Sequence, residues 1–127
     1  MITLLPSLDV ILKDTLFQAD ELWRFKMRIL MKVRIPHEPF NTLVKEGKAG
    51  NIIQKIIEEL RPESIYFTEQ DGTRGAVAIV NINDPSQIPS FSEPFFLKFN
   101  ADCQFRIAMT PEDLGKAGLD ELGKKWS

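Results

Sequence analysis

Apolar and polar side chains alternate along three stretches of the chain, and this alternation predicts strands. The central stretch, residues 64–82, holds two alternating runs joined at Asp71-Gly72, a dipeptide typical of a two-residue hairpin turn. Residues 27–36 and residues 102–109 alternate in the same way. The pattern therefore predicts four strands, two of which form a hairpin.

The position of the turn also fixes the register of the hairpin. A turn at Asp71-Gly72 puts Glu69 opposite Arg74 and Tyr66 opposite Val77. One face of the hairpin then carries Ile65, Phe67, Ala76, Ala78 and Val80, and the other carries Tyr66, Thr68, Val77, Ile79 and Asn81. Both faces are partly apolar, so we expect both to need cover from helices, a ligand or another chain.

Apolar residues at helical spacing predict a first helix over residues 42–60. Its regular part is expected at 51–60, because Gly47 and Gly50 each weaken a helix by about 1 kcal/mol. Pro62 should end it. Residues 37–41 are expected to form the loop before this helix.

A second helix is predicted after a turn and cap at residues 83–86. Phe91, Phe95 and Phe99 recur there at near-helical spacing. Pro94 lies among them and is expected to kink or split the helix.

The two ends of the chain carry further helical patterns. Residues 1–26 are expected to be an N-terminal helical extension, and Met27 is a sensible start for a shorter domain. Residues 27–127 form the domain, with a short C-terminal helical tail that begins at the cap sequence 110–113. The tail is expected to dock on the domain through Leu114, Leu119, Leu122 and Trp126.

Composition narrows the class of protein. The chain has 127 residues, 43% of them hydrophobic and 27% charged, which suits one globular domain. A net charge of −2 gives no general attraction to nucleic acid or to an anionic membrane. The single cysteine, Cys103, excludes an internal disulfide and fits a cytoplasmic location, and no apolar run is long enough to span a bilayer. No histidine pair supports a metal site, and nothing in the sequence calls for a cofactor.

The expected order is strand, helix, strand, strand, helix, strand. This is the ferredoxin-like βαββαβ pattern of the α+β class, a four-stranded antiparallel sheet with both helices on one face. The core from about residue 27 to 109 resembles the dimeric α+β barrel proteins. Five stretches are similar to a group of small bacterial proteins of uncharacterised function: 32–36, 62–67, 83–86, 93–96 and 100–101. The resemblance implies a homodimer whose sheets enclose a cavity, and cofactor-independent oxygenase or isomerase chemistry if the protein is an enzyme.

Basic residues on the first and fourth strands mark a candidate ligand site. In the ferredoxin-like order these strands are neighbours, so Lys32, Arg34 and Arg106 should converge on the face away from the helices. Buried cations need compensation, and a small anionic ligand such as a carboxylate would supply it, with Asn81 as a polar wall. The alternative is a solvated face, or ion pairs with acids such as Asp102.

Two residues are candidates for proton transfer, His37 and Tyr66. His37 is the only side chain that titrates readily near neutral pH, and it follows the first strand, where it should overhang the open face. The alternative is that His37 is an ordinary loop residue. No nucleophile, base and orienting acid recur at a recognisable spacing, so the sequence selects no reaction. The competing hypothesis is a non-enzymatic protein–protein interaction module that uses the same surface.

Overall fold

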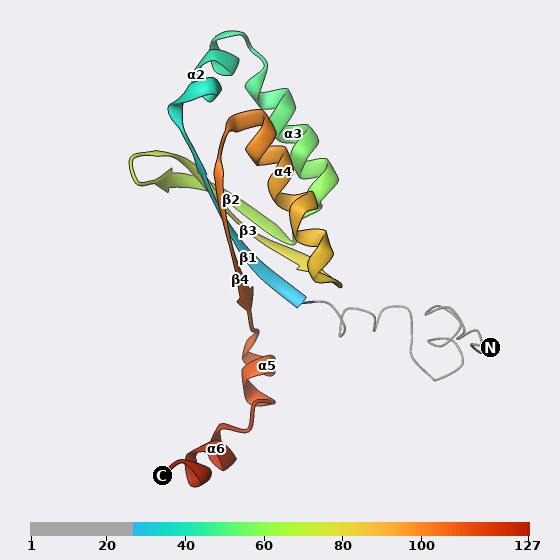
Figure 1. Cartoon of the computed structure of the whole chain (residues 1–127), viewed down its shortest axis with the longest axis vertical. Coiled ribbons are helices and arrows are strands. Elements are labelled where there is room, and N and C mark those ends of the chain that lie inside the picture. The colour runs from blue at the N-terminus through green and yellow to red at the C-terminus, as the bar shows by residue number, and fades with distance from the viewer. Residues whose placement is uncertain (1–26) are drawn as a thin grey trace, which may run out of the picture.

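The computed structural model describes residues 27–127 (Figure 1). The predicted N-terminal helical extension, residues 1–26, lies outside the described residues. The elements in chain order are β1 (Met27–Ile35), α2 (His37–Lys45), α3 (Ala49–Leu60), β2 (Ser64–Gln70), β3 (Thr73–Ile82), the 3₁₀ helix η2 (Pro85–Gln87), α4 (Ile88–Phe99), β4 (Asp102–Ala108), α5 (Pro111–Gly115) and α6 (Leu119–Lys125).

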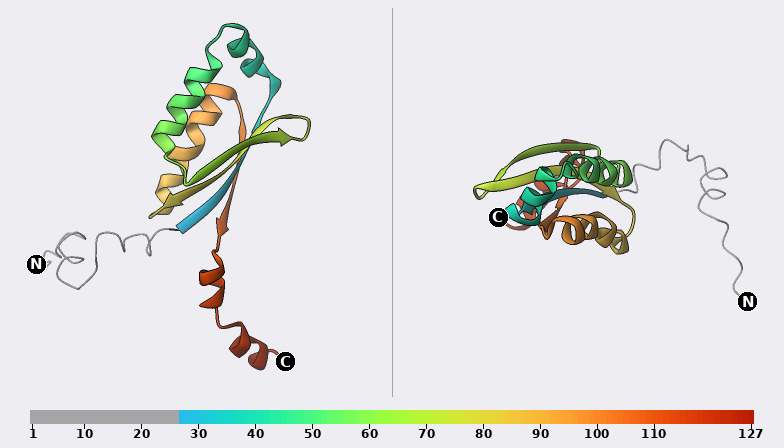
Figure 2. Two further views of the ribbon diagram at one scale, coloured as in Figure 1. Left: turned by 180° about the vertical axis from the view of Figure 1, so that it is seen from behind. Right: turned by 90° about the horizontal axis from the view of Figure 1, so that it is seen from above.

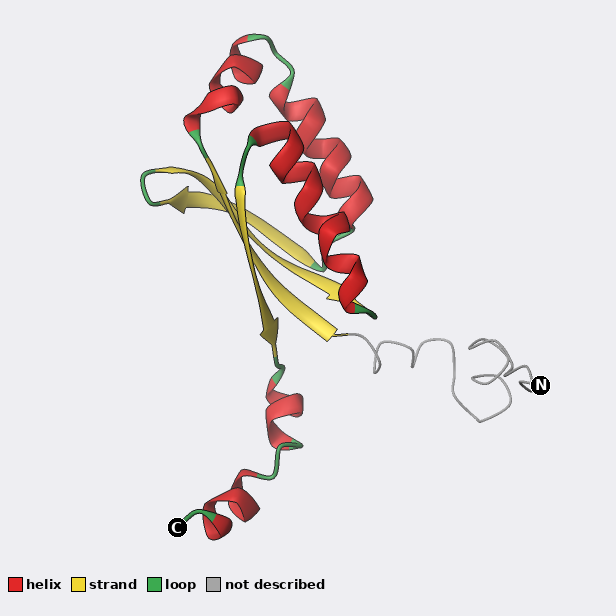
Figure 3. Ribbon diagram, in the orientation of Figure 1, coloured by secondary structure: helices red, strands yellow, loops and turns green. Residues whose placement is uncertain are grey.

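The strands form one antiparallel sheet of four strands in the order β2-β3-β1-β4 (Figure 3). The predicted hairpin register is confirmed, with Glu69 opposite Arg74 and Tyr66 opposite Val77. Strands β1 and β4 are neighbours as expected. The fold belongs to the α+β class, and the two edge strands of the sheet are β2 and β4.

Helices α3 and α4 run side by side over one face of the sheet and build the core there (Figures 1 and 2). The buried face of β1 consists of Ile29, Met31, Val33 and Ile35, as the alternation predicted. Phe99 is fully buried, and its ring centroid lies 5.0 Å from that of Phe40 and 6.4 Å from that of Phe95. No helix of residues 27–127 covers the opposite face of the sheet (Figure 2).

The expected loop at residues 37–41 is wrong, because α2 begins at His37. Glu38 keeps an extended backbone inside this element, and its carboxylate accepts hydrogen bonds from the Thr42 backbone amide at 3.3 Å and the Thr42 hydroxyl at 2.7 Å. Those bonds fix the turn in which Phe40 is buried.

The predicted single helix over residues 42–60 is in fact two, since Gly47 adopts a left-handed φ of +72° between α2 and α3.

The expected split at Pro94 is also wrong, because α4 continues through it. Phe91, Phe95 and Phe99, which lie on both sides of Pro94, are all buried, so both halves of the helix are packed in the core. The predicted cap before the helix is confirmed. The Asp84 carboxylate accepts a hydrogen bond from the Ser86 backbone amide at 2.8 Å, and the Gln87 side-chain oxygen accepts one from the Asp84 backbone amide at 3.1 Å.

Gly75 lies where β3 of the hairpin pairs with β1, and the space there is too small for a side chain. A Cβ atom at this position would lie 2.7 Å from the Gln70 Cβ and 2.9 Å from the Val33 backbone oxygen.

Gly75→Ala is therefore expected to lower the free energy of unfolding by about 1–3 kcal/mol. Gly50→Ala is the matched control, since Gly50 lies in α3 with no atom near its missing Cβ. That change should stabilise the protein by about 0.5–1 kcal/mol. Urea denaturation of both variants tests the pair, and equal effects would contradict the close approach at Gly75.

The C-terminal tail does not dock on its own domain, which corrects the prediction. Residues 111–127, called the arm below, leave the end of β4 and extend away from the sheet (Figure 1). Every residue of the arm is exposed. Ile107 and Met109 at its base were expected on the apolar side of β4, yet they are 72% and 66% exposed. The edge strand β4 extends beyond the helices here, so the other residues of the range 27–127 leave these side chains exposed.

Within residues 27–127, no helix is long and apolar enough to cross a membrane.

Candidate functional site

The face of the sheet opposite the helices, called the open face, is built from alternate residues of all four strands. The strand register arranges them in rows. One row runs Tyr66, Val77, Lys32, Gln104, and the next runs Ser64, Ile79, Leu30, Arg106. The middle of the open face is therefore an apolar strip with a cation at two points along it.

Lys32 and Arg106 are the unsatisfied charges of this strip. Neither forms an ion pair with any residue in the described range 27–127. Lys32 lies in the middle of the sheet and is partly buried, whereas Arg106 on the edge strand is exposed. Adjacent strands are about 4.8 Å apart, so the two side chains on neighbouring strands can approach the same small anion.

Arg34 is already neutralised. Its guanidinium lies 3.4 Å from the Asp102 carboxylate and 3.9 Å from that of Asp71, which sits at the hairpin turn. The predicted alternative of ion pairing with Asp102 thus describes Arg34. A small cavity of about 80 Å³ remains beside it, lined by Lys32, Gln70 and Gln104 among others.

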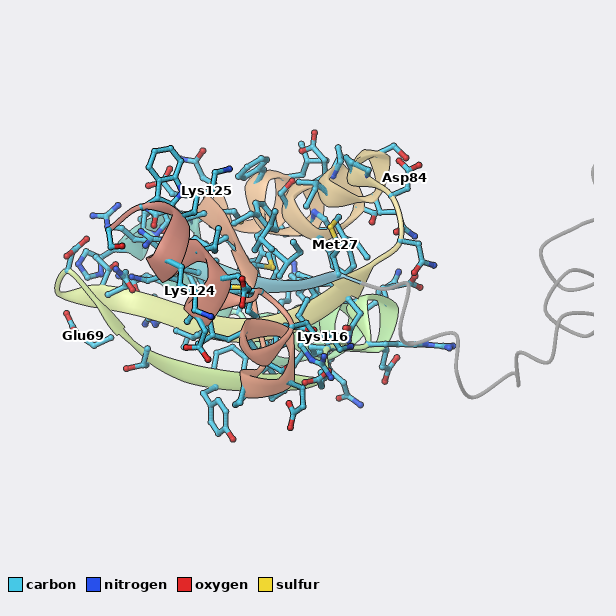
Figure 4. The ribbon with its side chains drawn as sticks, turned by 90° about the horizontal axis from the view of Figure 1, so that it is seen from below. Met27, Glu69, Asp84, Lys116, Lys124 and Lys125 are labelled. Carbon is cyan, nitrogen blue, oxygen red and sulfur yellow. The ribbon has the colours of Figure 1, made fainter. Side chains whose placement is uncertain are left out.

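Asn81 lies at the other end of the open face, in a second polar cluster. The Glu63 carboxylate accepts hydrogen bonds from the Asn81 side-chain amide at 3.3 Å and from Arg28 at 3.1 Å. The bond from Asn81 and then the Arg28 guanidinium lower the pKa of Glu63. Figure 4 shows Glu69, next to the hairpin turn, and Asp84, just after β3, on opposite sides of the view. Polar clusters thus close both ends of the open face and leave its middle rows free.

The structure separates the two residues expected to transfer protons. Tyr66 lies on the open face and is 71% exposed. His37 starts α2 and lines a cavity of about 510 Å³ on the helix side of the sheet, next to Phe40 and Phe67. The chain turns from β1 toward the helix layer at Pro36, so His37 does not overhang the open face as expected. The two side chains do not belong to one site.

The cavity at His37 is a feature that the sequence did not indicate. Arg74 bounds it, and the guanidinium carbon of Arg74 lies 4.6 Å from the Phe40 ring centroid while its nitrogen donates to the Asn41 side-chain oxygen at 2.7 Å. Arg74 is thus held by its own chain. Arg74 was expected only as the partner of Glu69 across the hairpin, so no signal in the pattern marked the cavity.

Metal binding finds no support in the part of the chain that the structure describes, because no three acidic, histidine or cysteine side chains there gather closely enough to hold an ion.

No protein-family model matches the chain, and no curated protein matches it either.

Proposed function

We propose that the protein is a cytoplasmic homodimer of ferredoxin-like subunits that encloses a pocket for a small anionic or polar organic molecule. The pocket lies on the open face, in the rows that contain Lys32 and Arg106. The observation that carries the proposal is the combination of two cations that form no ion pair within residues 27–127 with a partly exposed apolar strip. The strand order β2-β3-β1-β4 supports the ferredoxin-like arrangement.

Energetics supports an anionic occupant. A cation half removed from water loses hydration, and an anion that approaches both Lys32 and Arg106 would restore favourable interactions. The apolar strip of Leu30, Val77 and Ile79 would bury the carbon skeleton of an organic anion, which favours an amphipathic molecule over a simple ion. A second sheet placed over the first would exclude water and strengthen both effects.

The residues then take separate roles in the pocket. Lys32 and Arg106 hold the negative charge, and Gln104 is a neutral hydrogen-bonding neighbour. Arg34 and Asn81 close the two ends as parts of polar clusters. Tyr66 is the proton donor or acceptor available on this face, so oxygenase or isomerase chemistry at the open face would involve Tyr66 and not His37.

An anionic and a neutral dye together test the pocket. The full-length protein is titrated with 8-anilinonaphthalene-1-sulfonate, which carries a sulfonate, and with the uncharged N-phenyl-1-naphthylamine. The double variant Lys32→Met, Arg106→Met is expected to bind the anionic dye about tenfold more weakly or worse, because a charged hydrogen bond is worth about 1.5–3 kcal/mol. Its affinity for the neutral dye should stay the same, since the apolar strip is intact.

Lys45→Met is the matched control. Lys45 is exposed at the end of α2, on the helix side of the sheet, so its loss should change neither affinity. Circular dichroism verifies that each variant is folded. If the double variant binds the anionic dye as tightly as the unaltered protein, the open face is not the anion site.

A further inference from the structure

We infer that the arm, residues 111–127, packs on the open face of a second copy of this chain and forms a wall of its pocket. The inference rests on the homodimer of the proposed function and goes beyond it, because it assigns the segment that joins the two copies. It begins from the largest concentration of exposed apolar side chains in the described part of the chain.

The arm has defined helices but no core of its own. Thr110 and Asp113 form a reciprocal capping box at the start of α5, each accepting a hydrogen bond of 3.0 Å from the other's backbone amide. Leu119 and Leu122 of α6 are three residues apart, and Trp126 follows as the C-cap of this helix, four residues after Leu122. These three side chains are 57%, 44% and 77% exposed. An amphipathic helix with its apolar face in water is typical of a segment that binds another surface.

The arm's own sheet is not that surface. The arm leaves from β4 and extends away from the sheet, while the exposed Tyr66 lies on β2 at the opposite edge (Figures 1 and 3). With two strands between β4 and β2, the gap is about 14 Å. A second copy brings an arm to this face without any change in the path of the chain.

The number of residues on the open face also indicates that a dimer needs the arm. The four strands contain 9, 7, 10 and 7 residues, and alternation places about half of them, roughly 16, on the open face. A standard interface contains about 20–30 residues on each partner. The exposed apolar residues of the exchanged arms, Leu114, Leu119, Leu122 and Trp126, bring the contact into this range.

Charge favours the same pairing. The arm holds four carboxylates against three lysines. Two of the acids, Glu112 and Asp120, form no ion pair within residues 27–127, whereas Glu121 lies 3.5 Å from Lys124. The open face offers the cations Lys32 and Arg106, so the two surfaces attract each other on approach. A ligand anion then binds beneath the arm, between the cations and the apolar side chains that cover them.

The first experiment compares self-association by sedimentation equilibrium. The double variant Leu119→Asp, Leu122→Asp is expected to raise the dimer dissociation constant at least about 100-fold, because a twofold dimer contains each change twice and central contacts dominate such interfaces. Leu97→Asp is the matched control, since Leu97 is 80% exposed on α4, on the far side of the helix layer. It should leave the dissociation constant unchanged. Circular dichroism should show all these proteins folded, because the arm contributes no buried residue.

The second experiment locates the arm. In a Cys103→Ser background, a size-tagged chain with Leu122→Cys is mixed with an untagged chain with Tyr66→Cys and oxidised. A disulfide between the two different chains is expected, and a chain with Leu97→Cys in place of Tyr66→Cys should give none.

The outcomes separate the two proposals. A dimer that persists in the arm variant, without the cross-link to position 66, overturns the arm inference and leaves the homodimer intact. An unaltered chain that stays monomeric overturns the homodimer itself, and the arm inference with it. Loss of the dimer in the arm variant together with the cross-link supports both.

Discussion

Replacing Phe99 by alanine is expected to lower the free energy of unfolding by about 3–5 kcal/mol, close to the whole stability of a small domain. Phe99 is 0% exposed and packs against the rings of Phe40 and Phe95. It joins the end of α4 to α2 in the core on the helix side of the sheet, and the void left by its ring would be enclosed on all sides. Urea denaturation, followed by far-ultraviolet circular dichroism, measures the change in the free energy of unfolding.

Leu97→Ala is the control for Phe99→Ala. Leu97 lies two residues earlier in the same helix but is 80% exposed, so its truncation should change stability by no more than about 0.5 kcal/mol. Similar losses in the two variants would mean that Phe99 does not anchor the core.

Cys103 is expected to be nearly inert toward iodoacetamide in the folded protein. Burial, and then the negative charge of Asp102, raise the pKa of the Cys103 thiol to about 12. At pH 8 only about one thiol in ten thousand would then be a thiolate, which is the reactive form. In the unfolded chain an ordinary pKa of about 8.5 gives about one thiolate in four thiols, so folding should slow alkylation roughly 2500-fold. The rate in the folded protein should rise about tenfold for each pH unit between pH 7 and pH 10.

Mass spectrometry of the alkylated protein, with and without guanidinium chloride, measures both rates. The single cysteine makes the assignment unambiguous. A folded-state rate within tenfold of the unfolded rate at pH 8 would show that the thiol is neither shielded nor disfavoured as an anion.

The strands were predictable because their signals are local. The Asp71-Gly72 turn fixes the hairpin register without reference to the rest of the chain, and the alternation of β1 decides which side chains are buried. The Asp84 cap before α4 is local in the same sense.

The errors arose where tertiary contacts outweigh local signals. Helix α2 depends on the packing of Phe40 against Phe99, which is far along the chain. The local sequence around residues 37–41 contains proline and glutamate, so it predicts a loop there. Pro94 is tolerated because three buried phenylalanines hold α4 on the sheet. Local propensity gives way to packing at both places.

The candidate site was predictable only in part. Alternation places Lys32 and Tyr66 on one face, and the neighbouring positions of β1 and β4 follow from the expected fold. The path of the chain after β1 decides where His37 lies, and no local rule gives it. Apolar spacing in the arm indicates that its leucines need a partner, but a sequence cannot say whether that partner is the same molecule.

Because the arm lies outside the core, the residues that stabilise the fold and the residues that we infer to join two copies are separate sets. Substitutions among the exposed side chains of residues 111–127 change no buried contact. They should therefore leave the free energy of unfolding, which limits most mutations, nearly unchanged. In the dimer that we infer, substitutions in the arm would therefore change the pairing of the copies and leave the sheet and its helices as they are. A segment of this kind allows duplicated copies of one fold to become separate assemblies with few changes.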